Sequence, residues 1–302
     1  DTGVREQIDP SNGEVLAPIT LAGPAEVDQA VDAARAAFPE WRAIDPSVRR
    51  DLIMRFADLV DEQFEQLSVL RSLELGAPKK RGKGLNMAVE YMRYFAGWVD
   101  KIEGSTVPVN GAALNYTIPE PYGVVAALTP WNGGVVSAAM KVIPALVAGN
   151  CVVLKPSELA ALAPLRFGEL AHEAGLPSGV LSVIPGGIPA GEALVAHPGV
   201  NKISFTGGTI TARHVMAGAA TNLTPVILEL GGKSANVVFA DADLTAAVQT
   251  TVFLALAGMS GQGCVLPTRL LVQADVFDEV IKLVVDMTNS IKVGRPFDQG
   301  VQ

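Results

Sequence analysis

Two side chains of this 302-residue sequence are of types that covalent chemistry on a carbonyl group would need, Cys264 and Glu229. Cys264 ends the segment GQGC, whose glycines let a substrate approach closely, and a cysteine thiol is intrinsically very nucleophilic. Glu229 ends the apolar run PVILE, where a carboxylate is costly unless it faces a cleft or has a chemical task. The alternative for a lone cysteine is an inert buried thiol, which we assign to Cys151 inside an apolar strand.

A third candidate is Asn132, which ends the segment TPWN after a predicted strand. A side-chain amide can donate a hydrogen bond to a developing oxyanion, and such a donor contributes about 3–4 kcal/mol to a transition state. The alternative is an asparagine that satisfies the backbone of its own turn. Asn132 alone does not decide between the two.

Two further segments suit a nucleotide. Lys155 and Glu158 in LKPSE stand at a strand end, where a carboxylate can accept from the vicinal hydroxyls of a ribose. The segment SFTGGT (204–209) opens a helix with small residues, and free N–H groups at a helix N-terminus can bind a pyrophosphate. The alternatives are a helix that starts with Ser157 as its cap and Glu158 in its first turn, and a plain strand–turn–helix connection at TGGT.

The elements that must position these residues alternate between short apolar strands and helices. Four strands are each followed by a loop and a helix, which predicts a parallel sheet with helices on both faces. We expect these strands at 123–128, 151–154, 180–184 and 201–205. The helices that follow them should lie at 135–148, at 161–175, in the segment that ends at 196, and at 210–220. Because parallel sheets bind ligands beyond the carboxyl ends of their strands, the four loops should line one crevice.

The rest of the chain flanks this unit. Helical spacing predicts a helix at 24–42 and two long surface helices at 46–75 and 78–101. Alternation, an Asn-Gly pair and three prolines predict a hairpin arm at 105–123. A second unit should begin near 225, with elements at 225–229, 243–257, 268–273 and 276–292.

The composition excludes several classes of protein. With 49% hydrophobic and 18% charged residues, the chain can bury a large core and is not disordered. A net charge of −8 without a basic stripe argues against nucleic acid or an anionic membrane as partner. Residues 133–154 are long enough to span a bilayer, but Lys141 near their middle favours a packed helix, a turn and a strand. Two cysteines fit a reducing compartment, and scattered histidines predict no metal site.

Taken together, the segments TPWN, LKPSE, FTGGT, LELGGKS and GQGC, in this order, closely resemble the NAD(P)-dependent aldehyde dehydrogenase superfamily. The resemblance implies an α/β fold whose Rossmann-like, NAD-binding domain covers 1–228, with 105–123 as an oligomerisation arm. Residues 229–302 would then be the first part of a second α/β catalytic domain, and the chain would lack the rest of it.

The resemblance also implies roles for individual residues. Cys264 would be the nucleophile and Glu229 the general base, and Asn132 with the backbone N–H of Cys264 would form the oxyanion hole. Lys141 matches a lysine commonly kept in the family and joins the catalytic group. The residues implied to bind the cofactor are Trp131, Lys155, Ser157, Glu158, Gly187, Gly191, Phe205, Thr206, Gly207, Gly208, Leu230 and Gly231.

The implied activity is oxidation of a small-molecule aldehyde to its carboxylic acid with NAD⁺, through a thioester that water hydrolyses. NADP is less favoured, because a 2′-phosphate would meet the Glu158 carboxylate. The alternatives are a CoA-acylating relative, a plain cysteine hydrolase and a non-catalytic truncated relative. We expect a cytoplasmic protein that forms a homodimer or homotetramer at full length, and we expect the 302-residue piece alone to bind NAD⁺ weakly without turnover.

Some positions depart from the family's pattern. Gly208 stands where serine is usual, Ala212 replaces a glycine, and Gly134 stands where proline is common. These departures concern the affinity for the cofactor. The aromatic residues of the segment 78–101 could line an aldehyde tunnel or serve in ordinary helix packing; they are Tyr91, Tyr94, Phe95 and Trp98.

Overall fold

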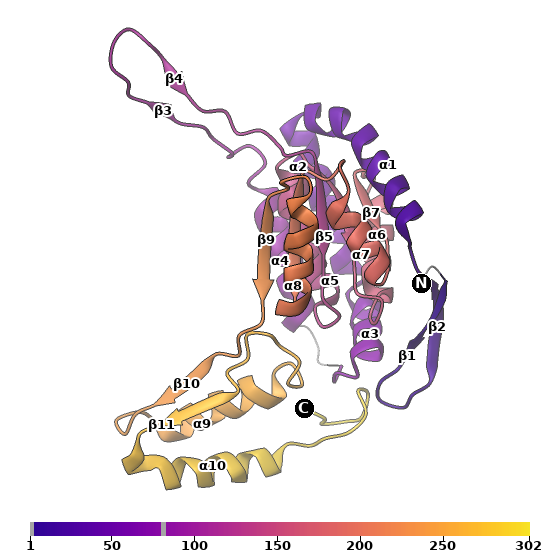
Figure 1. Ribbon diagram of the computed structural model, residues 1–302. Coiled ribbons are helices and arrows are strands. Elements are labelled where there is room, and N and C mark those ends of the chain that lie inside the picture. The colour runs from indigo at the N-terminus through magenta and orange to yellow at the C-terminus, as the bar shows by residue number, and fades with distance from the viewer. Residues whose placement is uncertain (1–2, 80–82) are drawn as a thin grey trace.

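The computed structural model describes residues 3–79 and 83–302, and its centre is a five-stranded, all-parallel sheet (Figure 1). The strand order is β7-β6-β5-β8-β9. The strands are β5 (Val124–Leu128), β6 (Cys151–Lys155), β7 (Leu181–Val183), β8 (Lys202–Gly207) and β9 (Val226–Leu230). The predicted fold class, an α/β protein with a parallel sheet, is confirmed.

Two helical layers cover the sheet. On one face lie α1 (Pro24–Ala43), α7 (Ile188–Ala196) and α8 (Thr209–Ala220), and on the other lie α5 (Gly134–Val147) and α6 (Leu162–Glu173), backed by α2 (Pro46–Glu62) and α4 (Lys83–Ala96). Every residue of β5 and β6 is buried, which explains why these strands, apart from Lys155 at the end of β6, are continuous apolar runs rather than alternating ones. The main core gathers around them.

The strand order reverses between β5 and β8. The chain leaves β5 toward α5 on one face and leaves β8 toward α8 on the opposite face. Such a switch point opens a crevice beyond the carboxyl ends of the two strands, where open parallel sheets bind their ligands. The segment TPWN follows β5, and β8 ends in the first glycine of the segment GGT.

Three predicted helices differ from the structure. The single helix predicted at 46–75 is wrong: α2 ends at Glu62, and α3 (Phe64–Leu75) starts after Gln63 and packs on α6. The helix predicted at 78–101 ends earlier than predicted, because α4 (Lys83–Ala96) is followed by turns; residues 80–82 of the predicted helix lie outside the described residues. The helix predicted at 243–257 is α9 (Leu244–Val252) continued by one π-helical turn (Phe253–Ala257).

Smaller units complete the chain. β1 (Val4–Ile8) and β2 (Val15–Thr20) form an antiparallel hairpin that lies below the start of α1 in Figure 1. A second hairpin, β3 (Thr106–Val107) with β4 (Asn115–Tyr116), projects far from the body of the molecule (Figure 1). In residues 3–79 and 83–302, no helix is both long and apolar enough to cross a membrane.

A separate two-stranded parallel sheet follows β9. It pairs β10 (Ala235–Val238) with β11 (Arg269–Val272), and α9 and α10 (Phe277–Ser290) pack around a small core of their own. β9 belongs to the first sheet up to Leu230, because its residues pair with β8. The first sheet therefore continues two positions beyond residue 228, where we predicted the first domain to end.

Candidate active site

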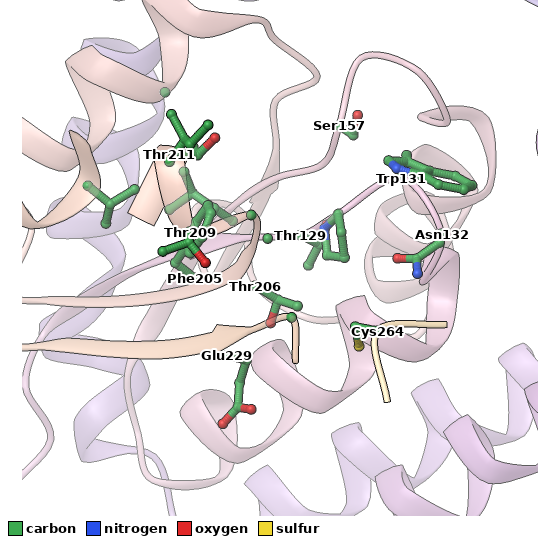
Figure 2. Close-up of a pocket in the computed structure, with 18 of the residues that line it drawn as sticks. Thr129, Trp131, Asn132, Ser157, Phe205, Thr206, Thr209, Thr211, Glu229 and Cys264 are labelled. Carbon is green, nitrogen blue, oxygen red and sulfur yellow. The ribbon is translucent and has the colours of Figure 1, made fainter. Parts of the chain in front are cut away.

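A cavity of about 1110 Å³ lies beyond the carboxyl ends of the central strands (Figure 2). Its wall combines the loops after β5 and β6, parts of α7 and α8, the end of β9 and the loop that ends in Cys264. The predicted site residues that line it are Trp131, Asn132, Lys155, Ser157, Glu158, Gly187, Gly191, Phe205, Thr206, Gly207, Gly208, Glu229, Gly231 and Cys264. Lys141 and Leu230 do not line it.

The thiol of Cys264 is exposed at one end of this cavity. Asn132 lies on the same side of the cavity, as Figure 2 shows, and its side-chain nitrogen donates a hydrogen bond to the carbonyl oxygen of Gln262. The amide of Asn132 therefore binds the cysteine loop, which is remote in sequence, and not its own turn. A side-chain amide has two N–H donors, so one remains for another acceptor.

Glu229 lies on β9 and also lines the cavity; in Figure 2 it lies below Thr206, and its carboxylate points away from Cys264. Behind the cavity wall, the Lys141 Nζ on α5 donates to the Ser204 hydroxyl at 2.9 Å. Burial lowers the pKa of Lys141 to about 8, while the nearby Glu229 carboxylate opposes this shift. The Lys141 ammonium is thus close enough to Glu229 for their charges to attract.

Lys155 and Glu158 lie at the end of β6. Lys155 is 9% exposed, and its Nζ donates to the carbonyl oxygen of Pro156 at 3.2 Å and lies 4.0 Å from the Glu158 carboxylate. Burial lowers the pKa of Lys155, and the Glu158 charge counteracts the shift. The alternative in which Ser157 starts a helix is wrong, because α6 begins at Leu162. The intervening turn instead carries Glu158 into the cavity wall.

The start of α8 forms the opposite wall. Gly208 is the N-cap of α8, and a Cβ atom there would meet nothing within 4 Å. A Cβ atom on Gly207 would come within 2.5 Å of the Phe205 ring, so only glycine fits there without movement. The free N–H groups at the start of α8 face space that no side chain of Gly207 or Gly208 blocks, as an anion site requires.

Sequence reasoning missed several residues of the cavity wall. Glu192 on α7 and His214 on α8 line it. Each lies three to four residues from other lining positions of its helix, and this helical spacing could have indicated that both face the cavity. Lys233 and Gln262 also line it. They belong to recognised segments, but their partners are remote in sequence: the Lys233 Nζ donates to the Gly263 carbonyl at 2.8 Å, and the Gln262 Nε2 to the Leu75 carbonyl at 2.9 Å.

The sequence profile described as the aldehyde dehydrogenase family matches residues 1–302. The chain belongs to this family. An aldehyde dehydrogenase of Enchytraeus buchholzi is 43% identical over 299 residues, which are 96% of this chain and 60% of that protein. The human mitochondrial aldehyde dehydrogenase is 41% identical over 298 residues, 96% of this chain and 57% of that protein.

A solved structure supports the same assignment. The chain superimposes on an NAD⁺ complex of aldehyde dehydrogenase from Bacillus cereus with a TM-score of 0.95 at 37% identity, which covers 99% of this chain and 62% of that one. The resemblance stated from the sequence is thereby confirmed. The chain spans about three fifths of the length of the relatives that it matches.

The departures from the family's pattern have local explanations. Gly134 has a φ of +46°, which proline cannot adopt, so the backbone at the start of α5 requires glycine here. Ala212 is 2% exposed and packs into the main core as part of α8. Gly208 leaves open space where a serine side chain would fit.

Proposed function

We propose that the protein carrying this chain oxidises an aldehyde to the carboxylic acid with NAD⁺, using Cys264 as nucleophile. The observation that carries the proposal is that one continuous cavity is lined by Cys264, Asn132 and Glu229 and also by Lys155, Glu158 and the start of α8. A thiol beside an amide donor suits carbonyl chemistry, and the remaining wall suits a dinucleotide.

The residues present fit NAD⁺. The Glu158 carboxylate offers acceptors for ribose hydroxyls, and the open N-terminus of α8 at Gly208 offers N–H donors to a pyrophosphate. The carboxylate would repel a 2′-phosphate, which favours NAD⁺ over NADP⁺. The structure of the Bacillus cereus relative is an NAD⁺ complex, in agreement with this choice.

The residues of the chain then divide the reaction into two halves. The Cys264 thiol gives up its proton to solvent and its sulfur bonds to the carbonyl carbon, and the oxygen that gains negative charge accepts from the Asn132 amide and the Cys264 backbone N–H. Bound NAD⁺ supplies the acceptor for the hydride that leaves this carbon, and an acyl group then remains on Cys264 as a thioester. Glu229 removes a proton from the water that attacks the thioester, which releases the acid and restores the thiol.

Glu229 and Lys141 support this second half. The Glu229 side chain is exposed, so it can rotate from the orientation in Figure 2 toward a water above the thioester. The pKa of Lys141, about 8, keeps the ammonium largely charged at pH 7. Its charge attracts the Glu229 carboxylate from behind the cavity wall.

The retained Glu229 favours water over CoA as the acyl acceptor, since a CoA thiol would need no water-activating base.

We further propose that the hairpin of β3 and β4 serves assembly into a homodimer or homotetramer, because it projects from the body and exposes Leu114, Tyr116 and Ile118. Both cysteines are free, in agreement with the cytoplasm that we propose as compartment.

Absorbance at 340 nm tests the activity. The full-length protein should reduce NAD⁺ with an aldehyde in the absence of CoA, and Cys264→Ala should abolish the reduction. The matched control is Cys151→Ala, which removes the buried thiol and should leave turnover in place. Reduction at the parental rate by Cys264→Ala, or a strict requirement for CoA, would overturn the proposal.

A further inference from the structure

Lys233 holds the peptide groups on both sides of Cys264. Its Nζ donates to the carbonyl oxygen of Gly263 at 2.8 Å, and its backbone N–H donates to the carbonyl oxygen of Cys264 at 3.4 Å. The carbonyl of Lys233 in turn accepts from the Arg269 guanidinium at 3.0 Å. No mechanistic step described above uses the Lys233 side chain.

The Gly263 carbonyl and the Cys264 N–H belong to the same peptide unit. A peptide unit is planar and trans, so its C=O and N–H point in opposite directions, and fixing one fixes the other. An ammonium bonded to the oxygen also draws electron density from the nitrogen, which makes the N–H a stronger donor at the far end. Within residues 3–79 and 83–302, the Cys264 N–H donates to no other group, so it is free for a ligand.

The backbone conformation of Lys233 is unusual, in agreement with a functional role for this residue. Its φ is +54°, in the left-handed region that residues other than glycine rarely adopt. Such strained positions persist where the surroundings hold them in place, and they concentrate at functional sites. The strain here lets a single residue present its N–H and its side chain to two successive carbonyls of the cysteine loop.

We propose that Lys233 is a positioning residue for the oxyanion hole, which it orients and polarises through the Gly263–Cys264 peptide. The proposal rests on the proposed function, because it assumes that Cys264 attacks a carbonyl carbon. It predicts that Lys233 raises the rate of those reactions of Cys264 that pass through an oxyanion. The rates of reactions without an oxyanion should not depend on Lys233.

Two reactions of the Cys264 thiol separate these cases. With p-nitrophenyl acetate, the sulfur bonds to the acyl carbon through a tetrahedral oxyanion, p-nitrophenolate leaves, and solvent takes the thiol proton. With iodoacetamide, the sulfur displaces iodide from a saturated carbon, and no oxyanion forms. Neither reaction needs NAD⁺, so both can be measured in the full-length protein without turnover.

The decisive variant is Lys233→Met, which keeps the length of the side chain and removes its charge and donors. We expect acylation to slow about tenfold, the effect of weakening a single hydrogen bond, and alkylation to change less than twofold. Lys233→Arg, which retains a charged donor, should recover part of the acylation rate. Lys233→Asn, a residue that tolerates positive φ, provides the same test if the methionine variant does not fold.

Unchanged acylation in Lys233→Met would overturn the proposal, and so would an equal loss in both reactions, since that would indicate a merely structural role. Failure of the proposed function gives a different result. If Cys264→Ala released p-nitrophenolate as fast as the parent protein, Cys264 would not be the nucleophile. The proposed function would then fail, whatever the effect of the Lys233 variants.

Discussion

The turn between β8 and α8 contains two adjacent glycines with opposite surroundings, so a substitution at one is a control for a substitution at the other. A Cβ atom on Gly207 would lie 2.5 Å from the Phe205 ring, whereas one on Gly208 would meet nothing within 4 Å. Carbon atoms pack best at about 3.5–4.0 Å, so Gly207→Ala must displace the ring by about 1 Å. Phe205 is 5% exposed and belongs to the main core, so the ring has little room to move.

Overpacking of this kind costs about 1–3 kcal/mol. We therefore expect Gly207→Ala to lower the free energy of unfolding by that amount and to weaken NAD⁺ binding, because Phe205 and the start of α8 line the same cavity. Gly208→Ser should instead raise stability by a few tenths of a kcal/mol, since Gly208 is an N-cap with an extended backbone and serine is a better N-cap than glycine. Its hydroxyl should also tighten NAD⁺ binding.

Urea unfolding followed by tryptophan fluorescence and isothermal titration with NAD⁺ measure both effects in the full-length protein. The reasoning predicts opposite signs for two substitutions at adjacent positions. Equal stability of Gly207→Ala and the parent protein would refute the steric argument. A loss of more than about 1 kcal/mol in Gly208→Ser would refute the claim that space is open above the helix N-terminus.

Three further predictions concern other residues. At pH 8, iodoacetamide should label the exposed Cys264 and spare Cys151, because burial raises the pKa of Cys151 to about 12; peptide mass spectrometry shows which thiol reacts. Burial raises the pKa of Glu74 to about 7 from 4.5, so the folded chain keeps a proton that the unfolded chain loses, and stability falls as pH rises through this window. Urea unfolding should show Glu74→Gln gaining on the parent protein between pH 5 and pH 8, and a constant difference would contradict this. Arg49→Met should lower the free energy of unfolding by about 2–4 kcal/mol, because the buried guanidinium donates to three backbone carbonyls. In the same urea experiment, Arg50→Met at the more exposed neighbouring position should lower it by under about 0.5 kcal/mol.

The sheet and the crevice were predictable because they follow from local patterns. Short apolar runs at 124–128 and 151–154 are buried on both sides, and loops that leave parallel strands gather at one edge. The break at Gln63 was not predictable in this way. No proline or glycine marks it, and the packing of α3 against α6, which is remote in sequence, leaves no local signal.

Remote contacts also explain why the alternative helix start at Ser157 is wrong, although the predicted helix at 161–175 is close to the observed α6. The segment Pro156–Glu158 has the local features of a helix start, yet α6 begins at Leu162 because the Glu74 carboxylate of α3 accepts from the N–H groups of Leu162 and Ala163. Local sequence does not reveal a cap that another helix supplies. The bonds from Lys233 to the cysteine loop were invisible for the same reason, although the segments that contain them were recognised.

The central claim is that an acyl group is carried on Cys264 and released by water that Glu229 activates. Glu229→Gln should trap this intermediate, because an amide cannot take the proton from water. Full-length Glu229→Gln protein, incubated with NAD⁺ and an aldehyde and then digested, should yield the peptide of Cys264 heavier by one acyl group in mass spectrometry. A peptide of unchanged mass, or an acyl group on another residue, would contradict the account.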